Sequence, residues 1–316
     1  MTIYKSPLFQ VALLIIAHSA SAGFEWVDTE GKHTDLKHNG KNIVRYMYEV
    51  MDPADRERTY KPFHHVYDRD GKGFITKGAG GKFTHHRGIY YGFSKCTVAD
   101  ATGKKTSVDT WHCKRAYEQH VATVAQEAGE DKAWHKVKIE WRLDSGEAFA
   151  VEYRTLSFSL AKDGALVVDF HSELESLQDE IVVDGDPQHA GFQFRASDEV
   201  NTSTKGQTYY IRPGDGKDEP GKTKNWPGNK DMTNLLWKGQ SLVVGGNRYT
   251  TVYLDHPDNP KPSFYSERDY GRFGSYFKAT VKKGEGNRLA INYRLNIKPG
   301  ERTPEECAAL SIAYLE

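Results

Sequence analysis

The residues best suited to chemistry in this sequence are two adjacent histidines and an arginine, His85-His86-Arg87. They follow the glycine-rich run 78–81 and precede an aromatic stretch that opens at Gly88. Imidazoles titrate near neutral pH, and a guanidinium is a fixed cation. In a strand only one of the two histidines would face a given cleft, whereas a turn after the glycines would present both. The pattern predicts an acid–base group beside a cation that stabilises oxyanion charge; the alternative is a half-exposed pair packed on strand aromatics.

Further polar groups follow apolar strands, where binding sites often form. Trp111-His112 places an imidazole beside an indole that could stack on a sugar ring. The apolar run 249–254 ends in Asp255-His256 and is stopped by a proline. Residues 267–269 are three consecutive charges before an aromatic–glycine sequence. For each group a structural role, as a packed imidazole or a local salt-bridge cluster, stays open as the alternative.

Established catalytic and metal motifs are missing from the sequence. There is no His-Glu-x-x-His, no Gly-x-Ser-x-Gly and no Cys-x-x-Cys. No histidine spacing specifies a metal site, so we assign no metal ligand and leave the cofactor unknown. A metal-dependent enzyme with ligands among His85, His86, His112 and His256 remains an alternative.

The elements that must hold these residues are mostly strands. Apolar and polar residues alternate with period two over 137–143, 149–153 and 289–297, which is typical of half-buried antiparallel strands. Asn39-Gly40 predicts a type I′ hairpin turn, and 115–128 is interpreted as strand rather than helix. Residues 53–62 and 213–232 are expected to be loops. The cap Thr303-Pro304-Glu305-Glu306 predicts one C-terminal helix. We therefore expect an all-β fold, a large antiparallel β-sandwich with a short C-terminal helix.

The first 22 residues are interpreted as a secretory signal peptide. Lys5 precedes an apolar run, 8–17, that is too short to span a bilayer, and Ala20-Ser21-Ala22 offers a cleavage site. The alternative is a buried N-terminal helix. We expect a secreted or periplasmic protein cleaved after Ala22, with residues 23–316 as a single β-sandwich domain.

Composition narrows the range of partners. The 316 residues carry 43 basic and 43 acidic side chains, so no basic surface argues for nucleic acid. The 12% aromatic content suits β-strands first and carbohydrate binding second. We expect a small-molecule or glycan ligand and no membrane span after residue 22; the oligomeric state is left unknown. Cys96 and Cys113 could be bridged if their strands pair in a hairpin, or could stay free.

Taken together, these blocks resemble a family of secreted bacterial proteins of unknown function, often labelled "methane oxygenase PmoA". A true membrane methane monooxygenase subunit needs several apolar spans of about 20 residues, and the sequence after residue 22 has none, so the label is not adopted as a function. The family looks sugar-related, and its length and β content are similar to the galactose mutarotase-like supersandwich, in which histidines and a carboxylate act on a sugar ring. At Ser266-Glu267 the chain departs from the Trp-His of its relatives. The matching signatures are Pro62-Phe63, Thr76-Lys77-Gly78, His85-His86-Arg87-Gly88, Trp111-His112, Glu152 with Arg154-Thr155, 191–195, Asp255-His256-Pro257 with Asn259-Pro260, and Arg268-Asp269-Tyr270-Gly271.

We therefore expect a carbohydrate-active hydrolase, lyase or epimerase; the alternative is a non-catalytic glycan-binding module. His85 or His86 would be the acid–base group, Arg87 and Arg268 would hold substrate oxygens, and Trp111 would stack on a sugar. The candidate catalytic residues are His85, His86, Arg87, Glu152 and Asp269. The candidate substrate-binding residues are Trp111, His112, Arg195, His256, Glu267, Arg268 and Tyr270.

Overall fold

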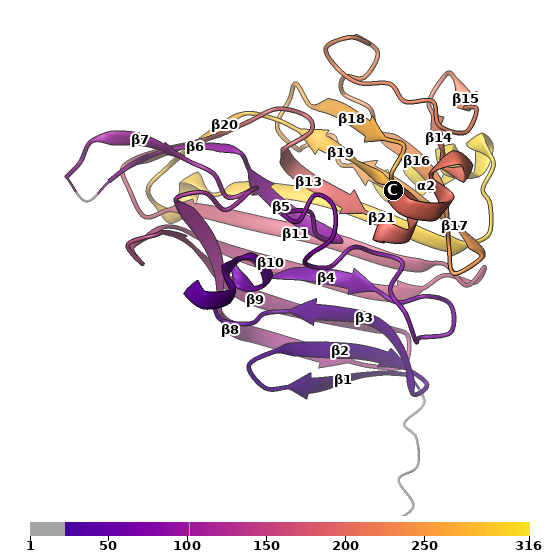
Figure 1. Ribbon diagram of the computed structural model, residues 1–316, viewed down its shortest axis with the longest axis horizontal. Coiled ribbons are helices and arrows are strands. Elements are labelled where there is room, and N and C mark those ends of the chain that lie inside the picture. Colours follow the sequence, from indigo (N-terminus) through magenta and orange to yellow (C-terminus); the bar gives the residue numbers. More distant parts are fainter. Residues whose placement is uncertain (1–22, 101) are drawn as a thin grey trace, which may run out of the picture.

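The chain folds into antiparallel sheets, with helix confined to short segments (Figure 1). The computed structural model describes residues 23–100 and 102–316. The expected signal peptide, residues 1–22, lies outside the described residues. Within the described residues the strands form three sheets, of eight, nine and four strands. The all-β class and the short C-terminal helix expected from the sequence are confirmed.

The two large sheets pack face to face, and in Figure 1 strands β1–β4 lie in front of β8–β10. In spatial order the first sheet contains β1 (Phe24–Thr29), β2 (His33–His38), β3 (Lys41–Met47), β4 (Phe63–Val66), β5 (Ile89–Phe93), β13 (Ala190–Arg195), β19 (Arg272–Tyr276) and β18 (Phe264–Arg268). The second contains β15 (Gly216–Lys217), β14 (Tyr209–Arg212), β16 (Trp237–Val244), β17 (Asn247–Asp255), β21 (Leu289–Pro299), β11 (Leu166–Ser176), β10 (Ala148–Leu160), β9 (Lys132–Leu143) and β8 (Ala116–Ala128). The small third sheet contains β20 (Ala279–Lys282), β12 (Glu180–Asp184), β6 (Lys95–Ala99) and β7 (Lys105–Val108).

Aromatic side chains join the two large sheets. The ring of Phe192 on β13 lies 4.4 Å from that of Phe170 on β11 and 4.8 Å from that of Tyr293 on β21, between centroids. Tyr91 on β5 and Trp141 on β9 are 5.9 Å apart. Each such side chain contributes about 1.5–3 kcal/mol when it is fully buried. The apolar residues of the alternating strands therefore pack into one continuous core between the sheets.

The local signals in the sequence are confirmed. Asn39 and Gly40 have φ values of 50° and 77°, as a type I′ turn requires. Residues 116–128 form strand β8 rather than a helix. In α2 (Pro304–Leu315) the Thr303 hydroxyl accepts from the N–H of Glu306, whose carboxylate accepts from the N–H of Thr303, so the capping box is present.

One expectation needs correction. The predicted loop 53–62 contains a short helix, α1 (Arg56–Thr59), which buries only Thr59 and so leaves no apolar period to detect. Of the two alternatives left open for Cys96 and Cys113, the unbridged one is found: all three cysteines are free and buried. The register of β6 and β7 sets Cys96 opposite Val108, and Cys113 turns away with its sulfur 3.4 Å from the carbonyl oxygen of Thr110. The remaining short helical segments are Pro53–Asp55, Val200–Thr204, Lys205–Gln207 and Glu285–Asn287.

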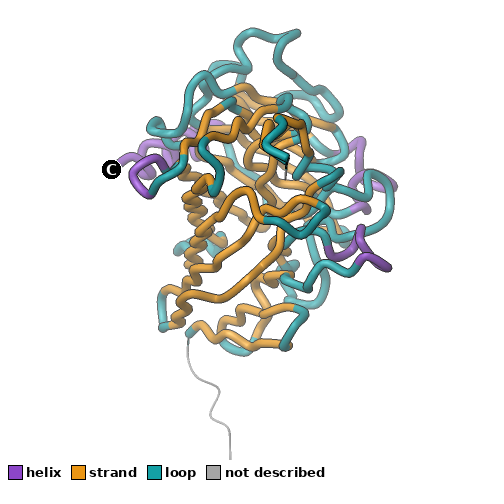
Figure 2. The backbone as a smooth tube through the Cα atoms, turned by 90° about the vertical axis from the view of Figure 1, so that its left-hand side faces the viewer, coloured by secondary structure: helices purple, strands orange, loops and turns teal. Residues whose placement is uncertain are grey.

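Three connections bring polar residues toward the middle of the first sheet. They are residues 67–88 between β4 and β5, 109–115 between β7 and β8, and 185–189 between β12 and β13. In the view of Figure 2, loops gather on one side of the layered strands. No helix within residues 23–100 and 102–316 is both long and apolar enough to cross a membrane.

Candidate functional site

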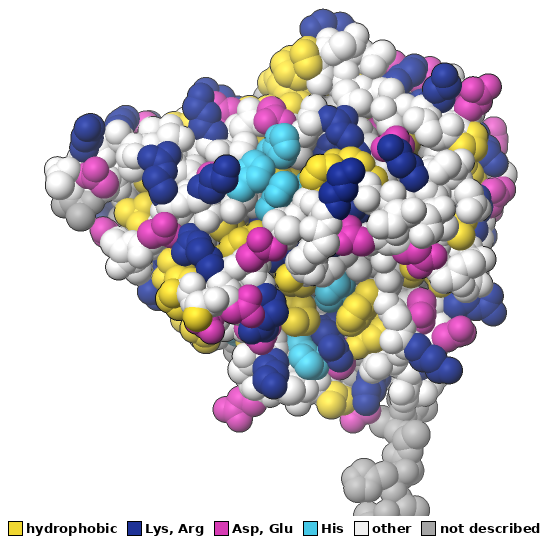
Figure 3. Space-filling view, viewed as in Figure 1, with side chains coloured by type: hydrophobic (Ala, Val, Ile, Leu, Met, Phe, Trp, Pro, Cys, Tyr) yellow, Lys and Arg dark blue, Asp and Glu magenta, His cyan; other side chains and the backbone are white. Residues whose placement is uncertain are grey.

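Three histidines from three connections meet at the surface, and we call His85, His112 and His189 the imidazole cluster. The ring centroid of His85 lies 4.3 Å from that of His112 and 6.4 Å from that of His189. His112 and His189 are 5.1 Å apart. Figure 3 shows histidine side chains gathered near the middle of one face of the molecule. These rings are close enough to act on one ligand.

Carboxylates orient two of the three imidazoles. Nδ1 of His112 lies 2.7 Å from Oδ2 of Asp109, and Nδ1 of His189 lies 3.0 Å from Oδ2 of Asp186. A carboxylate that accepts from Nδ1–H leaves Nε2 as the free, basic nitrogen of a neutral ring. His85 has no such partner, and its buried Nε2 makes no hydrogen bond among the described residues. Burial lowers the pKa of His85 to about 2, so this ring is neutral at pH 7.

The backbone is strained where it delivers these rings. Phe83, two residues before His85, has a φ of 57°, and Cys113, directly after His112, has a φ of 54°. Arg115 follows at 63°. Non-glycine residues with positive φ cost free energy and concentrate at functional sites. The chain turns at residues 84 and 85, where the N–H of His86 donates to the carbonyl oxygen of Phe83 at 2.9 Å. The ring centroids of His85 and His86 lie 4.4 Å apart, but the two rings line different hollows rather than one cleft.

An open pocket of about 540 Å³ adjoins the imidazole cluster. Its walls include the rings of His85 and His112 together with Tyr60 and the start of α1. Lys114 and Arg56 line its outer part. The pocket is wide and polar, which suits a hydroxylated ligand more than an apolar one.

Beneath the pocket lies a narrow polar crevice that we call the arginine crevice. It is lined by His86, Arg87, Tyr90, Trp111, Gln193, Arg195 and Arg272. Burial, with the nearby Arg272, moves the pKa of His86 far below its ordinary value, so this ring is also neutral. Tyr270 forms part of the surrounding wall, since the guanidinium of Arg195 lies 4.8 Å from its ring centre.

Buried ionisable groups continue below the crevice. The Lys61 ammonium donates to the carbonyl oxygen of Trp111 and lies 4.0 Å from the ring centre of Tyr90. Burial lowers the pKa of Lys61 to about 8. The Tyr90 hydroxyl lies 3.3 Å from Oε1 of Glu118, and burial raises the pKa of that carboxyl to about 8. Ionisable groups poised near neutral pH are typical of functional sites.

The structure brings seven of the predicted site residues together, from four separate segments. His85, His86 and Arg87 share the region with Trp111, His112, Arg195 and Tyr270. Trp111 has a different role from the one expected: it is 2% exposed and packs against Tyr90, so no ring face is open for a sugar to stack on. Its indole N–H instead faces the crevice without a partner among the described residues.

Five predicted residues lie in other surroundings. Glu152 is in the core of β10, bound to the guanidinium of Arg154 at 2.7 Å and to the indole N–H of Trp141 at 3.0 Å. Glu267 is buried between Arg212 at 2.7 Å and Lys238 at 3.0 Å. The other three, with their contacts, are Arg268 with Asn225, Asp269 with Lys205, and His256 with Asp258 and Tyr314. None of these contacts is with the imidazole cluster.

Four residues of the site are not among the candidate residues named from the sequence: Asp109, Asp186, His189 and Arg272. One signal could have found three of them. Asp109 and His112, like Asp186 and His189, are spaced Asp-x-x-His, and both pairs form the same contact between carboxylate and Nδ1. No comparable signal marks Arg272, whose partners come from distant segments.

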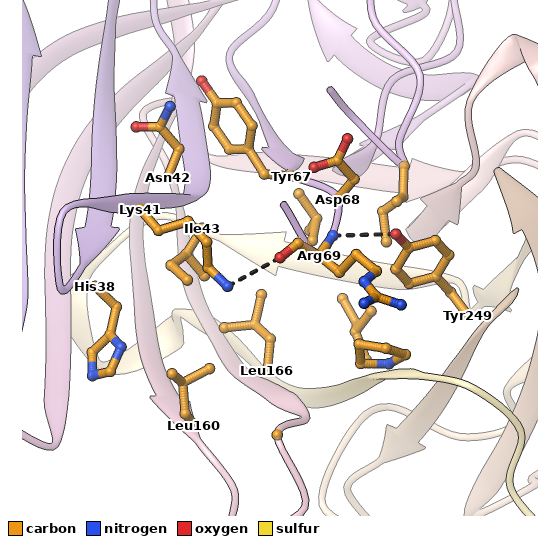
Figure 4. Close-up of a pocket in the computed structure, with 15 residues that line it drawn as sticks. His38, Lys41, Asn42, Ile43, Tyr67, Asp68, Arg69, Leu160, Leu166 and Tyr249 are labelled. Carbon is orange, nitrogen blue, oxygen red and sulfur yellow. Dashed lines mark hydrogen bonds between the residues drawn. The ribbon is translucent and has the colours of Figure 1, made fainter. Parts of the chain in front are cut away.

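A second hollow, of about 260 Å³, lies beside the starts of β3, β11 and β17 and the C-terminal end of β21 (Figure 4). Aliphatic side chains such as Ile43, Leu160 and Leu166 line most of it. The ammonium group of Lys41, which lines this hollow, donates to the carbonyl oxygen of Arg69 at 3.0 Å. Among the residues that line this hollow, His38 is the one histidine, so the hollow has none of the converging imidazoles of the first site.

Within the described part of the chain, no three His, Cys, Asp or Glu side chains are arranged to hold a metal ion. The nearest approach to a ligand set is the imidazole cluster. Its imidazole nitrogens can also perform acid–base chemistry directly.

Comparisons with known proteins give a family and distant architectural similarities. A model described as "Family of unknown function (DUF6807)" matches residues 33–311. Among curated proteins, none matches the chain significantly. A solved aldose epimerase homologue (GalM) from C. elegans is similar with a TM-score of 0.36 at 6% identity, over 89% of this chain and all of that one. Heparinase III is similar with a TM-score of 0.34 at 8% identity, over 89% of this chain and 37% of that one.

Proposed function

Since the chain belongs to the DUF6807 family, whose function is unknown, we propose its activity from the site itself: acid–base catalysis on a sugar-type ligand by the imidazole cluster. The observation that carries the proposal is the pair of Asp–His contacts beside an open pocket. Membership of an uncharacterised family agrees with the resemblance seen in the sequence. A secreted or periplasmic location and a single domain over residues 23–316 belong to the same proposal.

His112 is the proposed general base. The Asp109 carboxylate fixes its Nδ1–H, so Nε2 faces the ligand with a free electron pair and receives a proton from a ligand hydroxyl or C–H group. The developing imidazolium is stabilised by Asp109. His189, held by Asp186 at Nδ1, is the complementary acid: in its imidazolium form it donates the proton on Nε2 to the ligand and becomes neutral.

His85 and Arg87 position the ligand and stabilise charge. Because the His85 ring is neutral and its Nε2 is buried without a partner, it is a preorganised hydrogen-bonding group for a ligand oxygen. Arg87 supplies positive charge next to that oxygen. These groups suit proton transfer in an epimerase, a lyase or a hydrolase, which share the need for one base and one acid.

A carbohydrate ligand follows from the character of the pocket. Most residues that line the open pocket are polar or charged, and hydroxyl groups satisfy imidazole, guanidinium and carbonyl partners alike. Glu152 and Asp269 are not needed in this mechanism, because the carboxylates that contact the imidazoles are Asp109 and Asp186.

Turnover on a panel of sugars and glycosides tests the proposal. Once a substrate is found, we expect His112→Gln and His85→Ala each to lower kcat about 10²–10⁴-fold. His256→Gln is the matched control and should leave kcat unchanged, because His256 contacts Tyr314 and Asp258 instead. Full turnover by both His85→Ala and His112→Gln would overturn the assignment.

Two alternatives would give different results in the same experiments. A non-catalytic glycan-binding module would bind a glycan and form no product, with binding that survives both substitutions. A metal-dependent enzyme would carry stoichiometric metal after purification, which elemental analysis would detect. Metal retained by the wild type and lost in His112→Gln would replace the acid–base mechanism with a metal-dependent one.

A further inference from the structure

The arginine crevice contains buried positive charge without a counter-ion. Arg87 and Arg272 are each 1% exposed, and neither has a carboxylate within ion-pair distance among the described residues. Arg87 donates to the carbonyl oxygens of Glu57, Thr84 and His86. Arg272 donates to Oε1 of Gln193 and Oγ of Ser266, both at 2.9 Å. All these acceptors are neutral.

Buried arginines elsewhere in the protein are paired. Arg154, also about 1% exposed, lies 2.7 Å from the carboxylate of Glu152 and 3.5 Å from that of Glu118. Arg212 binds Glu267 through two nitrogens, both at 2.7 Å. Pairing is the usual condition for burying a guanidinium, because an isolated charge loses its hydration without compensation. The crevice departs from that rule within a chain that otherwise obeys it.

The strand register makes the excess charge worse. Arg195 on β13 and Arg272 on β19 are directly opposite each other across the ladder. Like charges in that position repel. The Asp198 carboxylate lies 3.3 Å from the Arg195 guanidinium, and it also forms an ion pair with the Lys77 ammonium group at 2.6 Å. Burial, opposed by Asp198, lowers the pKa of Arg195 to about 10. An anion bound beside the guanidinium groups of Arg195 and Arg272 would relieve this repulsion.

Unused hydrogen-bond donors line the same crevice. Nε of Arg87, Nε of Arg195 and Nε1 of Trp111 are buried and have no partner among the described residues. A buried donor without an acceptor costs about 1–3 kcal/mol, so three of them around one space indicate a missing acceptor. An anionic group with two or more oxygens would satisfy them together.

We propose that the arginine crevice binds the carboxylate of a sugar acid, such as a uronic acid, whose ring occupies the open pocket beside the imidazole cluster. This inference rests on the proposed function, since it names the substrate class of the same site. A planar carboxylate matches the fork of a guanidinium. The crevice is closed in this structure and has no room for a water-sized group, so the carboxylate enters only if the lining side chains move apart. A sulfated or phosphorylated sugar has related chemistry and is separated from the carboxylate by the test.

Ligand-induced thermal stabilisation tests the proposal without any turnover. The full chain is heated at pH 7 and constant ionic strength with glucuronate or galacturonate, with glucose or galactose, and with glucose 6-sulfate. We expect the uronates to raise Tm in a saturable way while the neutral sugars do not, because a ligand stabilises the state that it binds. A larger shift with the sulfated sugar would reject the carboxylate in favour of sulfate. Equal shifts with neutral sugars would overturn the anion site.

Two variants localise the effect. Arg272→Gln should abolish the uronate shift, and Trp111→Phe, which removes the indole N–H but keeps an aromatic side chain, should weaken uronate binding about tenfold. Arg212→Gln, a buried arginine outside the crevice, is the matched control and should keep the wild-type affinity even if its Tm is lower. If Arg272→Gln does not fold, Trp111→Phe decides alone: unchanged affinity there would overturn the site.

Binding of a uronate and turnover of a sugar are measured separately, so failure of the anion site can be told apart from failure of the proposed catalytic activity. Uronate binding without turnover of any sugar would support the anion site and count against the acid–base mechanism. Turnover of neutral sugars with no response to uronates would do the reverse.

Discussion

The carboxylate of Asp109 holds His112 through two contacts, one to the ring and one to the backbone. Oδ2 lies 2.7 Å from Nδ1 of the imidazole, and Oδ1 accepts the backbone N–H of His112, also at 2.7 Å. The side chain and its own peptide are thereby fixed to one group. This relationship determines the tautomer of His112 and the direction of its free nitrogen, and it suggests direct tests.

Asp109→Asn should lower kcat with little change in KM. The amide can turn its NH₂ group toward Nδ1, which then becomes an acceptor and leaves the proton on Nε2, the wrong tautomer for a base. We expect a loss of about 10²-fold or more, measured by steady-state kinetics on the substrate found above. Asp258→Asn, beside His256, is the control and should behave as the wild type. An unchanged kcat in Asp109→Asn would mean that His112 is not the base.

Chemical modification should distinguish the imidazole cluster from the core histidines without any substrate. His112 and His189 expose 23% and 35% of their side chains, whereas His64 and His135 are 1% and 0% exposed. Diethyl pyrocarbonate at pH 7, followed by peptide mass spectrometry, should modify the first two rapidly and the core pair only on unfolding. Fast modification of His64 or His135 in the folded chain would contradict this packing.

Stability should decrease as the pH falls from 6.5 toward 4. Burial lowers the pKa of His65 and His135 to about 3 and that of His120 to about 4, against an ordinary value of 6.5. Burial also lowers the pKa of His64, whose Nε2 lies 2.9 Å from that of His135, well below its ordinary value. Below pH 6.5 the unfolded chain therefore takes up protons that the folded chain does not, and each adds a slope of about 1.4 kcal/mol per pH unit.

One group opposes this trend. The pKa of Glu118 is raised by burial to about 8, so between pH 4.5 and 8 the folded chain holds a proton that the unfolded chain lacks. A single carboxyl does not balance the histidines. Urea denaturation at pH 7, 6 and 5 should therefore report a proton uptake on unfolding that grows as the pH falls and reaches two or more protons by pH 5. His120→Gln should reduce that uptake by about one. Equal stability at pH 7 and pH 5 would contradict the buried, neutral state of these rings.

Removing Arg154 should destabilise the protein strongly, because it would leave Glu152 as an uncompensated buried carboxylate. We expect Arg154→Met to lower the free energy of unfolding by about 3–5 kcal/mol in urea denaturation. Adding Glu152→Gln should restore part of that loss, since the amide is neutral and still accepts from Trp141 and Ser172. Glu152→Gln alone that retained stability yet lost all turnover would return this residue to the catalytic role expected from the sequence.

Local patterns determined the fold class and many of its details. The strands were predictable because alternation with period two depends only on neighbouring residues and on which face is wet. The Asn39-Gly40 turn and the Thr303 cap were predictable for the same reason, since their conformations are set by the chemistry of a few adjacent residues. His85 and His86 were recognisable as candidate site residues from the glycines before them.

Only the tertiary structure decided which side chains meet. The imidazole cluster combines three loops that are far apart in the sequence, and no local rule relates His85 to His189. The register of β13 and β19 set Arg195 opposite Arg272, and the core of β10 gave Glu152 a charged partner instead of a ligand. Long-range strand pairing and burial decide these relationships, because they determine which charges lose water and which neighbours replace it.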